Sequence, residues 1–215
     1  MRRHSNNNFY EVDALTTHRM ASKERRKQIL RSAIRVFAEH SYRGATTKMI
    51  SQEANVAEAL IYRHFKSKRF LFTEAVEHSC RRLVVEIERI LEMHPDDPAA
   101  ALGAVLEYYH ELLERHQDFA KMIFWVSAEL DSDDVREVYL PFQEQALELF
   151  MTAISGWQQQ GLLREDVPPR AAAWMILGSY QVLALMKHSG KLEEVNAKAA
   201  VALMKPYLAV ALTAK

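Results

Sequence analysis

The chain has 215 residues, enough for one or two domains with a buried core, and its 49% hydrophobic and 26% charged residues are typical of a globular protein. The single cysteine, Cys80, excludes an internal disulfide framework. No run reaches the roughly 18 apolar residues that a membrane span needs, and no apolar run follows Arg2 and Arg3 as it would in a secretory signal. We therefore expect a cytoplasmic protein with no membrane partner.

The formal net charge is zero, but the charges are unevenly distributed along the chain. Residues 1–70 contain 15 Lys and Arg against 6 Asp and Glu, whereas residues 71–215 contain 13 against 22. A basic N-terminal part on an acidic body indicates two tasks in one chain. The basic part is expected to meet a polyanion, either nucleic acid or an anionic membrane surface.

The N-terminal third predicts a disordered extension followed by three helices. Residues 1–20 contain an Asn run and show no regular period, so we expect disorder there. From Ser22, which can serve as an N-cap, apolar residues recur at helical spacing until Gly44 ends the first helix. Thr46 or Thr47 then caps a short helix, Asn55 suits a turn that needs a positive φ, and a second short helix covers about 57–64.

The rest of the chain predicts helices only. A long helix is expected from about Ser67 to Glu92, where HPDDP at 94–98 stops it. Further helices are predicted over 99–115, 117–130, 133–160, 169–187 and 192–213. We predict an all-α fold: an N-terminal three-helix head with a helix-turn-helix (21–70), joined through a shared long helix to a larger C-terminal helical body (71–215).

The helix pair at 47–64 meets the requirements of a helix-turn-helix, whose second helix lies in the major groove of DNA. Its inner face must be apolar, and its outer face must be polar or small. The residues that can turn inward onto the first helix are Ile50, Ala54, Val56, Ile61 and Phe65. Those left outside are Glu58, Ala59, Leu60 and Arg63, with Tyr62, His64 and Lys68 placed where donors to phosphate oxygens are needed.

The segment TTKMISQEANVAEALIYRHFKSKRFLFTEAV, residues 46–76, resembles the DNA-binding signature of the TetR family of transcriptional regulators. The matching features are the Thr pair, Ile50, Ala-Asn-Val at 54–56, Ile-Tyr at 61–62, Phe65 and Lys-Ser-Lys at 66–68. The resemblance implies phosphate contacts from Thr47, Tyr62, His64 and Lys68. It implies that the residues facing the bases of a double-stranded DNA operator are Lys48, Glu58, Ala59, Leu60 and Arg63.

Two positions depart from the pattern of the family. Asn55 stands where Gly is frequent, and Asn tolerates the positive φ of that turn. Ala57 stands where Ser or Thr is frequent, so the recognition helix lacks a hydroxyl N-cap, a loss of about 1 kcal/mol. Glu58 in the first turn partly offsets this loss, and although it repels phosphate it can accept a hydrogen bond from cytosine.

The acidic body shows no catalytic constellation, so we predict no enzymatic activity, no cofactor and no metal. HELLERH at 110–116 comes nearest to a zinc motif. A zinc site on a helix needs two His four residues apart. His110 and His116 are six residues apart and lie on different faces.

The resemblance implies a second role for the aromatic and Met-rich residues of the body, which on their own indicate packed core. A cavity among the body helices would bind a small, largely apolar effector. The predicted lining residues are Tyr108, Tyr109, His110, Phe119, Met122, Trp125 and Gln143.

The segment 171–187 is apolar nearly all round, so both of its sides must be buried. Paired with 141–160, it could form a four-helix bundle across a two-fold axis, as in TetR-like proteins; the alternative is a core helix within one chain. The candidate interface residues are Phe142, Ala146, Trp157, Trp174, Leu177, Tyr180 and Leu185. A homodimer would present two recognition helices about 34–36 Å apart and so favour a palindromic operator.

Together these features predict a TetR-like homodimeric repressor that a small effector releases from its operator. The helix that begins near Ser67 would couple the two domains, because it belongs to both. Two other classes stay open. An enzyme would need a convergent polar site, and a basic membrane-surface or adaptor module would bind anionic lipid without base preference.

Overall fold

The protein is described here from a computed structural model, which defines the backbone of residues 8–191 and the side chains of residues 22–191. Within this range the chain is helical, which confirms the predicted all-α fold. The helices are α1 (Asn8–Gly44), α2 (Thr47–Glu53), α3 (Glu58–His64), α4 (Lys68–Met93), α5 (Pro98–Arg115), α6 (Gln117–Ala128), α7 (Asp133–Gln159) and α8 (Pro169–His188). The predicted helix at 192–213 lies outside the described residues.

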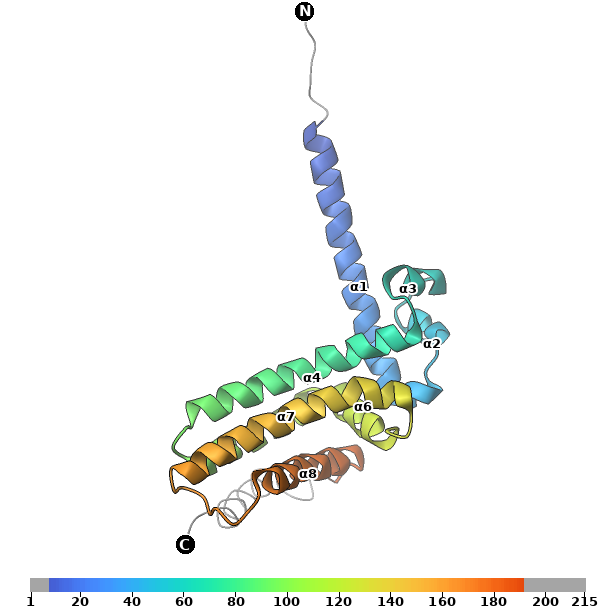
Figure 1. Ribbon diagram of the computed structural model, residues 1–215. Coiled ribbons are helices and arrows are strands. Elements are labelled where there is room, and N and C mark those ends of the chain that lie inside the picture. Colours follow the sequence, from blue (N-terminus) through green and yellow to red (C-terminus); the bar gives the residue numbers. More distant parts are fainter. Residues whose placement is uncertain (1–7, 192–215) are drawn as a thin grey trace, which may run out of the picture.

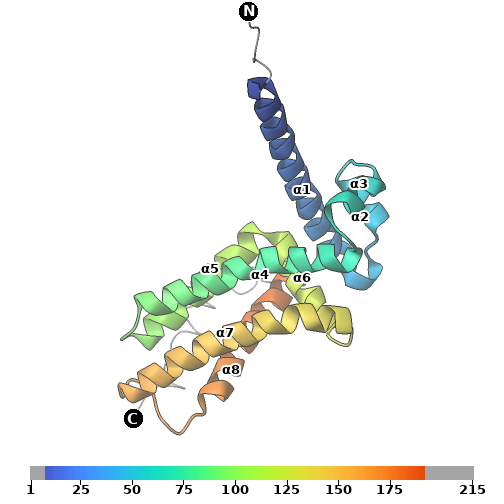
Figure 2. The ribbon, with the colours of Figure 1, turned by 45° about the horizontal axis from the view of Figure 1, so that its top comes forward.

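Helix α1 begins earlier than the sequence predicted. Its backbone is helical from Asn8, so residues 8–20 differ from the disordered extension expected over 1–20, and Ser22 lies inside the helix instead of capping it. Nucleation is the costly step of helix formation, and each further residue adds one hydrogen bond. A helix nucleated by the packed segment can therefore extend backwards. This N-terminal half of α1 projects away from the other helices (Figures 1 and 2).

The body is layered, with α7 between α4 and α8 (Figure 1). Helix α6 packs against α1 on one side and α8 on the other, and α5 contacts α4 and α8. The largest side chains enclosed in this core include Phe37, Phe72 and Phe150. Among residues 8–191, no helix combines the length and apolar character that a bilayer crossing requires.

The chain breaks its helical course at Ser41, whose φ of 60° and ψ of 179° lie in a region that is essentially restricted to glycine. Glu129, the residue after α6, holds this break. Its carboxylate accepts hydrogen bonds from the Ser41 hydroxyl at 2.9 Å and from the backbone N–H groups of Tyr42 at 2.9 Å and Arg43 at 3.4 Å. The body thus supplies the group that stabilises the end of α1.

Further acidic residues of the body contact the basic head at the same junction. The Tyr42 hydroxyl donates to Asp134 at 2.7 Å, Arg69 lies 3.3 Å from Asp134, and Arg43 lies 2.8 Å from Asp131. Burial and the hydrogen bond to Asp134 raise the pKa of Tyr42. The opposite charges of the two parts of the chain therefore meet where head and body join.

From the contacts of Glu129 we predict a clear loss of stability when its carboxylate is removed. Glu129→Ala should lower the free energy of unfolding by about 2–3 kcal/mol, because two backbone donors lose a charged acceptor and Ser41 loses the group that holds it. Urea unfolding followed by circular dichroism measures this. Asp131→Ala, which removes an exposed ion pair nearby, is the control and should change little. Equal effects of the two substitutions would show that Glu129 does not hold the break.

Candidate nucleic-acid interface and effector cavity

The turn between α2 and α3 forms as its local sequence predicts. The Thr46 side chain accepts a hydrogen bond from the backbone N–H of Met49 at 3.1 Å, which caps α2. Asn55 has a φ of 51°, so the expected positive φ is confirmed. Ala57 is the N-cap of α3 and makes no side-chain capping bond, which leaves Glu58 as the favourable charge at that helix end.

The predicted inner and outer faces of the helix pair are confirmed. The inner residues Ile50, Ala54, Ile61 and Phe65 are buried in the same cluster as Ile29, Ala33 and Phe37 of α1, while Val56 is half-buried. On the other side Lys48, Glu58, Ala59 and Arg63 are exposed and Leu60 is half-buried. The packing therefore fixes α3 with a polar face turned to solvent.

Three polar side chains proposed to contact DNA meet one another across α2 and α3. The Thr47 hydroxyl donates to Oε1 of Glu58 at 2.6 Å and lies 3.1 Å from the Tyr62 hydroxyl. A threonine hydroxyl has one proton, so Thr47 donates to Glu58 and accepts from Tyr62. Glu58 thus has a hydrogen-bond partner within the head. The sequence had predicted only that Glu58 faces the bases. The DNA contacts of these three residues stay predictions.

Lys68 has a structural role that the sequence did not reveal. Its ammonium group donates to the carbonyl oxygens of Tyr42 at 2.9 Å and Ala45 at 3.1 Å, and it lies 4.4 Å from the centre of the Tyr42 ring. Two of its three N–H donors are therefore used to join the end of α1 to the start of α4. The predicted phosphate contact stays a prediction and would have to use the remaining donor.

The cations of the head fall into two groups. Arg26 pairs with Glu74 and Arg35 pairs with Glu53, both at 2.7 Å, so their charges are partly neutralised. Lys48 and Arg63, on the exposed face of α2 and α3, make no ion pair within the described residues. Burial, together with the neighbouring arginines Arg63, Arg26 and Arg25, lowers the pKa of His64, which favours its neutral form. The positive potential of α3 therefore centres on Arg63.

Residues 29–75 match the model of a protein family described as "Bacterial regulatory proteins, tetR family". This segment forms the second half of α1, the helix-turn-helix and the start of α4. Residues 29–75 therefore carry the DNA-binding segment typical of the TetR family. That family consists of bacterial regulatory proteins, and the similar proteins are transcriptional regulators with a helix-turn-helix rather than enzymes.

Similar proteins extend the likeness over a larger part of the chain. The repressor DhaR of Mycobacterium sp. (strain GP1) is 27% identical over 164 residues, which is 75% of this chain and 81% of DhaR. Among solved structures, FadR of Bacillus subtilis in complex with stearoyl-CoA has a TM-score of 0.74 at 19% identity, covering 85% of this chain and 97% of FadR. A SmeT–triclosan complex has a TM-score of 0.72 at 24% identity, covering 89% and 93%. At these identities the structures show the fold alone.

The body contains a cavity of about 70 Å³ among α4, α5, α6, α7 and α8. Of the seven residues predicted to line an effector pocket, Tyr109 and Gln143 do so. Phe119 and Met122 are buried in the core, and Trp125 packs against Phe124 and His188. Tyr108 and His110 also lie outside the cavity lining, and each has a buried polar atom that finds no hydrogen-bond partner in the described part of the chain.

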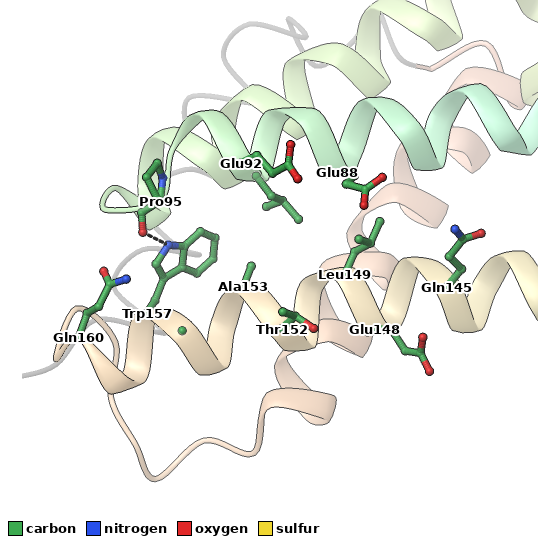
Figure 3. A pocket seen from close by; sticks show the side chains of 12 residues that line it. Glu88, Glu92, Pro95, Gln145, Glu148, Leu149, Thr152, Ala153, Trp157 and Gln160 are labelled. Atoms are coloured by element: carbon green, nitrogen blue, oxygen red, sulfur yellow. Dashed lines mark hydrogen bonds between the residues drawn. The ribbon is translucent and has the colours of Figure 1, made fainter.

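Most residues predicted for the dimer interface face the interior of the chain. Phe142, Ala146, Leu177 and Tyr180 line the cavity. Trp157 is buried, and its Nε1 donates to the carbonyl of Pro95 at 2.8 Å (Figure 3). The predicted interface role of Ala146, Trp157 and Tyr180 is therefore corrected. These side chains are buried within one chain and cannot form a contact surface for a second chain.

The outer face of α8 does expose apolar side chains. The predicted interface residues Trp174 and Leu185 are exposed, and Met175 and Val182, which the prediction missed, share the same face. The spacing of these four residues, with Gly178 between them, corresponds to one stripe along a helix. Helix α8 is therefore apolar on both sides for different reasons. Its inner side lines the cavity, and its outer side exposes apolar side chains.

A second hollow lies along the seam between α4 and α7, as an open groove of about 550 Å³ (Figure 3). Its apolar side chains include Leu91, Leu149 and Trp157, and Glu88 and Glu92 stand on α4. No sequence signal pointed to it, because its two walls are far apart in the chain. Within the described residues, no group of three or more His, Cys, Asp or Glu is arranged to hold a metal ion.

The buried Tyr180 hydroxyl has no hydrogen-bond partner within residues 22–191, so removal of this hydroxyl should have an unusual effect on stability. Tyr180→Phe should raise the free energy of unfolding by about 1 kcal/mol, because a buried hydroxyl without a partner is destabilising. Tyr42→Phe makes the same chemical change but breaks the bond to Asp134, so it should lower that free energy by about 1–2 kcal/mol. Chemical denaturation compares the two, and a loss in Tyr180→Phe would contradict the assignment.

Proposed function

We propose that this regulator is a homodimeric repressor that binds a palindromic operator through α2 and α3 and is released by a small, largely apolar effector. The observation that carries the proposal is the exposed face of α3, which presents Tyr62 and the unpaired Arg63 above a buried apolar inner face. Such a helix can enter the major groove, where an Arg side chain reads guanine. The DNA-binding part is residues 21–70, and residues 71–215 bind the effector and dimerise.

Three similar proteins support the proposed repressor role and the proposed apolar effector. DhaR is named a repressor, FadR was solved with stearoyl-CoA, and SmeT was solved with triclosan. Each of those ligands has a large apolar part. By analogy, the cavity lined by Tyr109 and Gln143 is the effector site of this chain.

The dimer in this proposal forms through the outer face of α8. Trp174, Met175, Val182 and Leu185 expose between 45% and 66% of their surface on one side of the helix. An exposed apolar stripe of this kind marks a contact with another protein surface. Packing α8 against its copy across a two-fold axis buries the stripe and places two recognition helices for successive major grooves.

Operator binding is tested by fluorescence anisotropy with DNA from upstream of the gene, with a scrambled duplex as the control and a series of salt concentrations. Specific binding should exceed the control by about 10³-fold or more and weaken as salt rises. Arg63→Ala should weaken operator binding by roughly 10- to 100-fold. Arg115→Ala, an exposed arginine of the body, is the matched control and should have no effect.

The DNA-binding proposal is wrong if the protein binds no duplex at low salt. It is also wrong if it binds both duplexes equally and selection from genomic fragments enriches no sequence. In either case, binding to vesicles of anionic lipid would favour the membrane-surface class.

Dimerisation through α8 is tested by substituting two valines that are exposed to nearly the same extent. Val182 on α8 is 55% exposed and Val85 on α4 is 56% exposed. Val182→Asp should convert the dimer to a monomer in sedimentation experiments, because a charge would enter the apolar contact. Val85→Asp should leave the dimer intact. A dimer that survives Val182→Asp, or a wild-type monomer, would exclude this interface.

A further inference from the structure

Among the described residues, no charged group lines the cavity of the body. The lining residues are apolar or carry only hydroxyl, thiol or amide groups. Burial raises the pKa of the Cys80 thiol and of the Tyr139 hydroxyl to about 12 in each case, so both are neutral near pH 7. A charged ligand group here would be buried without a counter-ion, which costs several kcal/mol.

One residue of the lining has an unused capacity for a hydrogen bond. Tyr180 is only 6% exposed, and its buried hydroxyl has no hydrogen-bond partner among the described residues. Its ring packs between the rings of Tyr109, at 5.1 Å, and Phe150, at 6.0 Å, so its position is held. The Tyr139 hydroxyl, by contrast, lies 3.5 Å from Nε2 of Gln181. Buried polar groups without a partner are rare and ask for an explanation.

The size of the cavity restricts how a ligand can enter it. Its volume of about 70 Å³ is below the roughly 150 Å³ of a cavity known to admit benzene. An aromatic ligand therefore requires a wider form, in which α4 and α7 move apart. Figure 3 shows the groove side of the seam between these helices, where Leu91 of α4 and Leu149 of α7 line the groove. Ile87 of α4 and Ala146 of α7 line the cavity.

We propose that the effector is an uncharged, compact and largely apolar molecule with one hydrogen-bonding group, which pairs with the Tyr180 hydroxyl in a widened form of this cavity. The proposal rests on the proposed function and names the ligand class for its effector site. Because α4 also carries Lys68, which holds the end of α1, a ligand that selects the wider seam shifts the position of the head.

The test uses three probes that share one apolar body: para-ethylphenol, ethylbenzene and para-ethylbenzoate. Near pH 7 the phenol is neutral and the benzoate is ionised. Isothermal titration calorimetry of the full-length protein without DNA measures their affinities. The wild type should bind para-ethylphenol about tenfold more tightly than ethylbenzene, which corresponds to about 1.4 kcal/mol. It should not bind para-ethylbenzoate.

Two phenylalanine variants locate the hydrogen bond. Tyr180→Phe should bind para-ethylphenol and ethylbenzene equally. Tyr108→Phe is the matched control, because it also removes a buried hydroxyl that has no partner among residues 22–191, but from outside the cavity lining. It should keep the tenfold preference of the wild type.

Three results would overturn the proposal: binding of para-ethylbenzoate as tight as that of the phenol, an unchanged preference in Tyr180→Phe, or binding of none of the probes. These experiments contain no DNA, so they can succeed even if operator binding fails. If para-ethylphenol binds as expected but does not weaken the complex with the operator, the ligand class stands and effector-controlled release fails.

Discussion

Carboxylates at the corner between α6 and α7 hold the two chain segments that enter and leave the helix-turn-helix. Glu129 accepts from the backbone around Ser41, where α1 ends, and Asp134 accepts from Tyr42 and lies beside Arg69 at the start of α4. The backbone of Ser41 adopts a conformation that few residues tolerate, so it requires such support. The placement of α2 and α3 relative to the body depends on this corner.

Helix α4 connects the same corner to the interior of the body. At its first residue, Lys68 holds the carbonyl groups of Tyr42 and Ala45, and more than three turns further along the helix Cys80 and Ile87 line the cavity. A helix transmits displacement along its length because its backbone hydrogen bonds make it stiff. The head and the cavity thus contact different parts of one helix. Such a connection is what effector control of DNA binding would need.

Helix α8 links the cavity to the proposed dimer contact in a similar way. Leu177 and Tyr180 line the cavity from its inner side, while Trp174 and Val182 stand on its outer side. In a dimer built on that outer side, a ligand that moves α8 would act on both copies at once. The spacing of two recognition helices would then respond to occupancy of either cavity.

The sequence by itself determined the features that depend on neighbouring residues. The helix bounds between 67 and 188, the cap at Thr46, the positive φ of Asn55 and the missing cap at Ala57 follow from local hydrogen bonds and helical period. The apolar inner face of the helix-turn-helix could be read in the same way, because α2 and α3 are only a turn apart.

Only the tertiary structure decided which distant residues meet. Periodicity shows that a face of a helix is buried but does not show what covers it, so Tyr180 and Ala146 looked like interface residues although they line a cavity. The bond between Thr47 and Glu58 and the carbonyl contacts of Lys68 depend on how the helices are placed in space. Glu129 carries no local signal, because its partners lie almost 90 residues away in the chain.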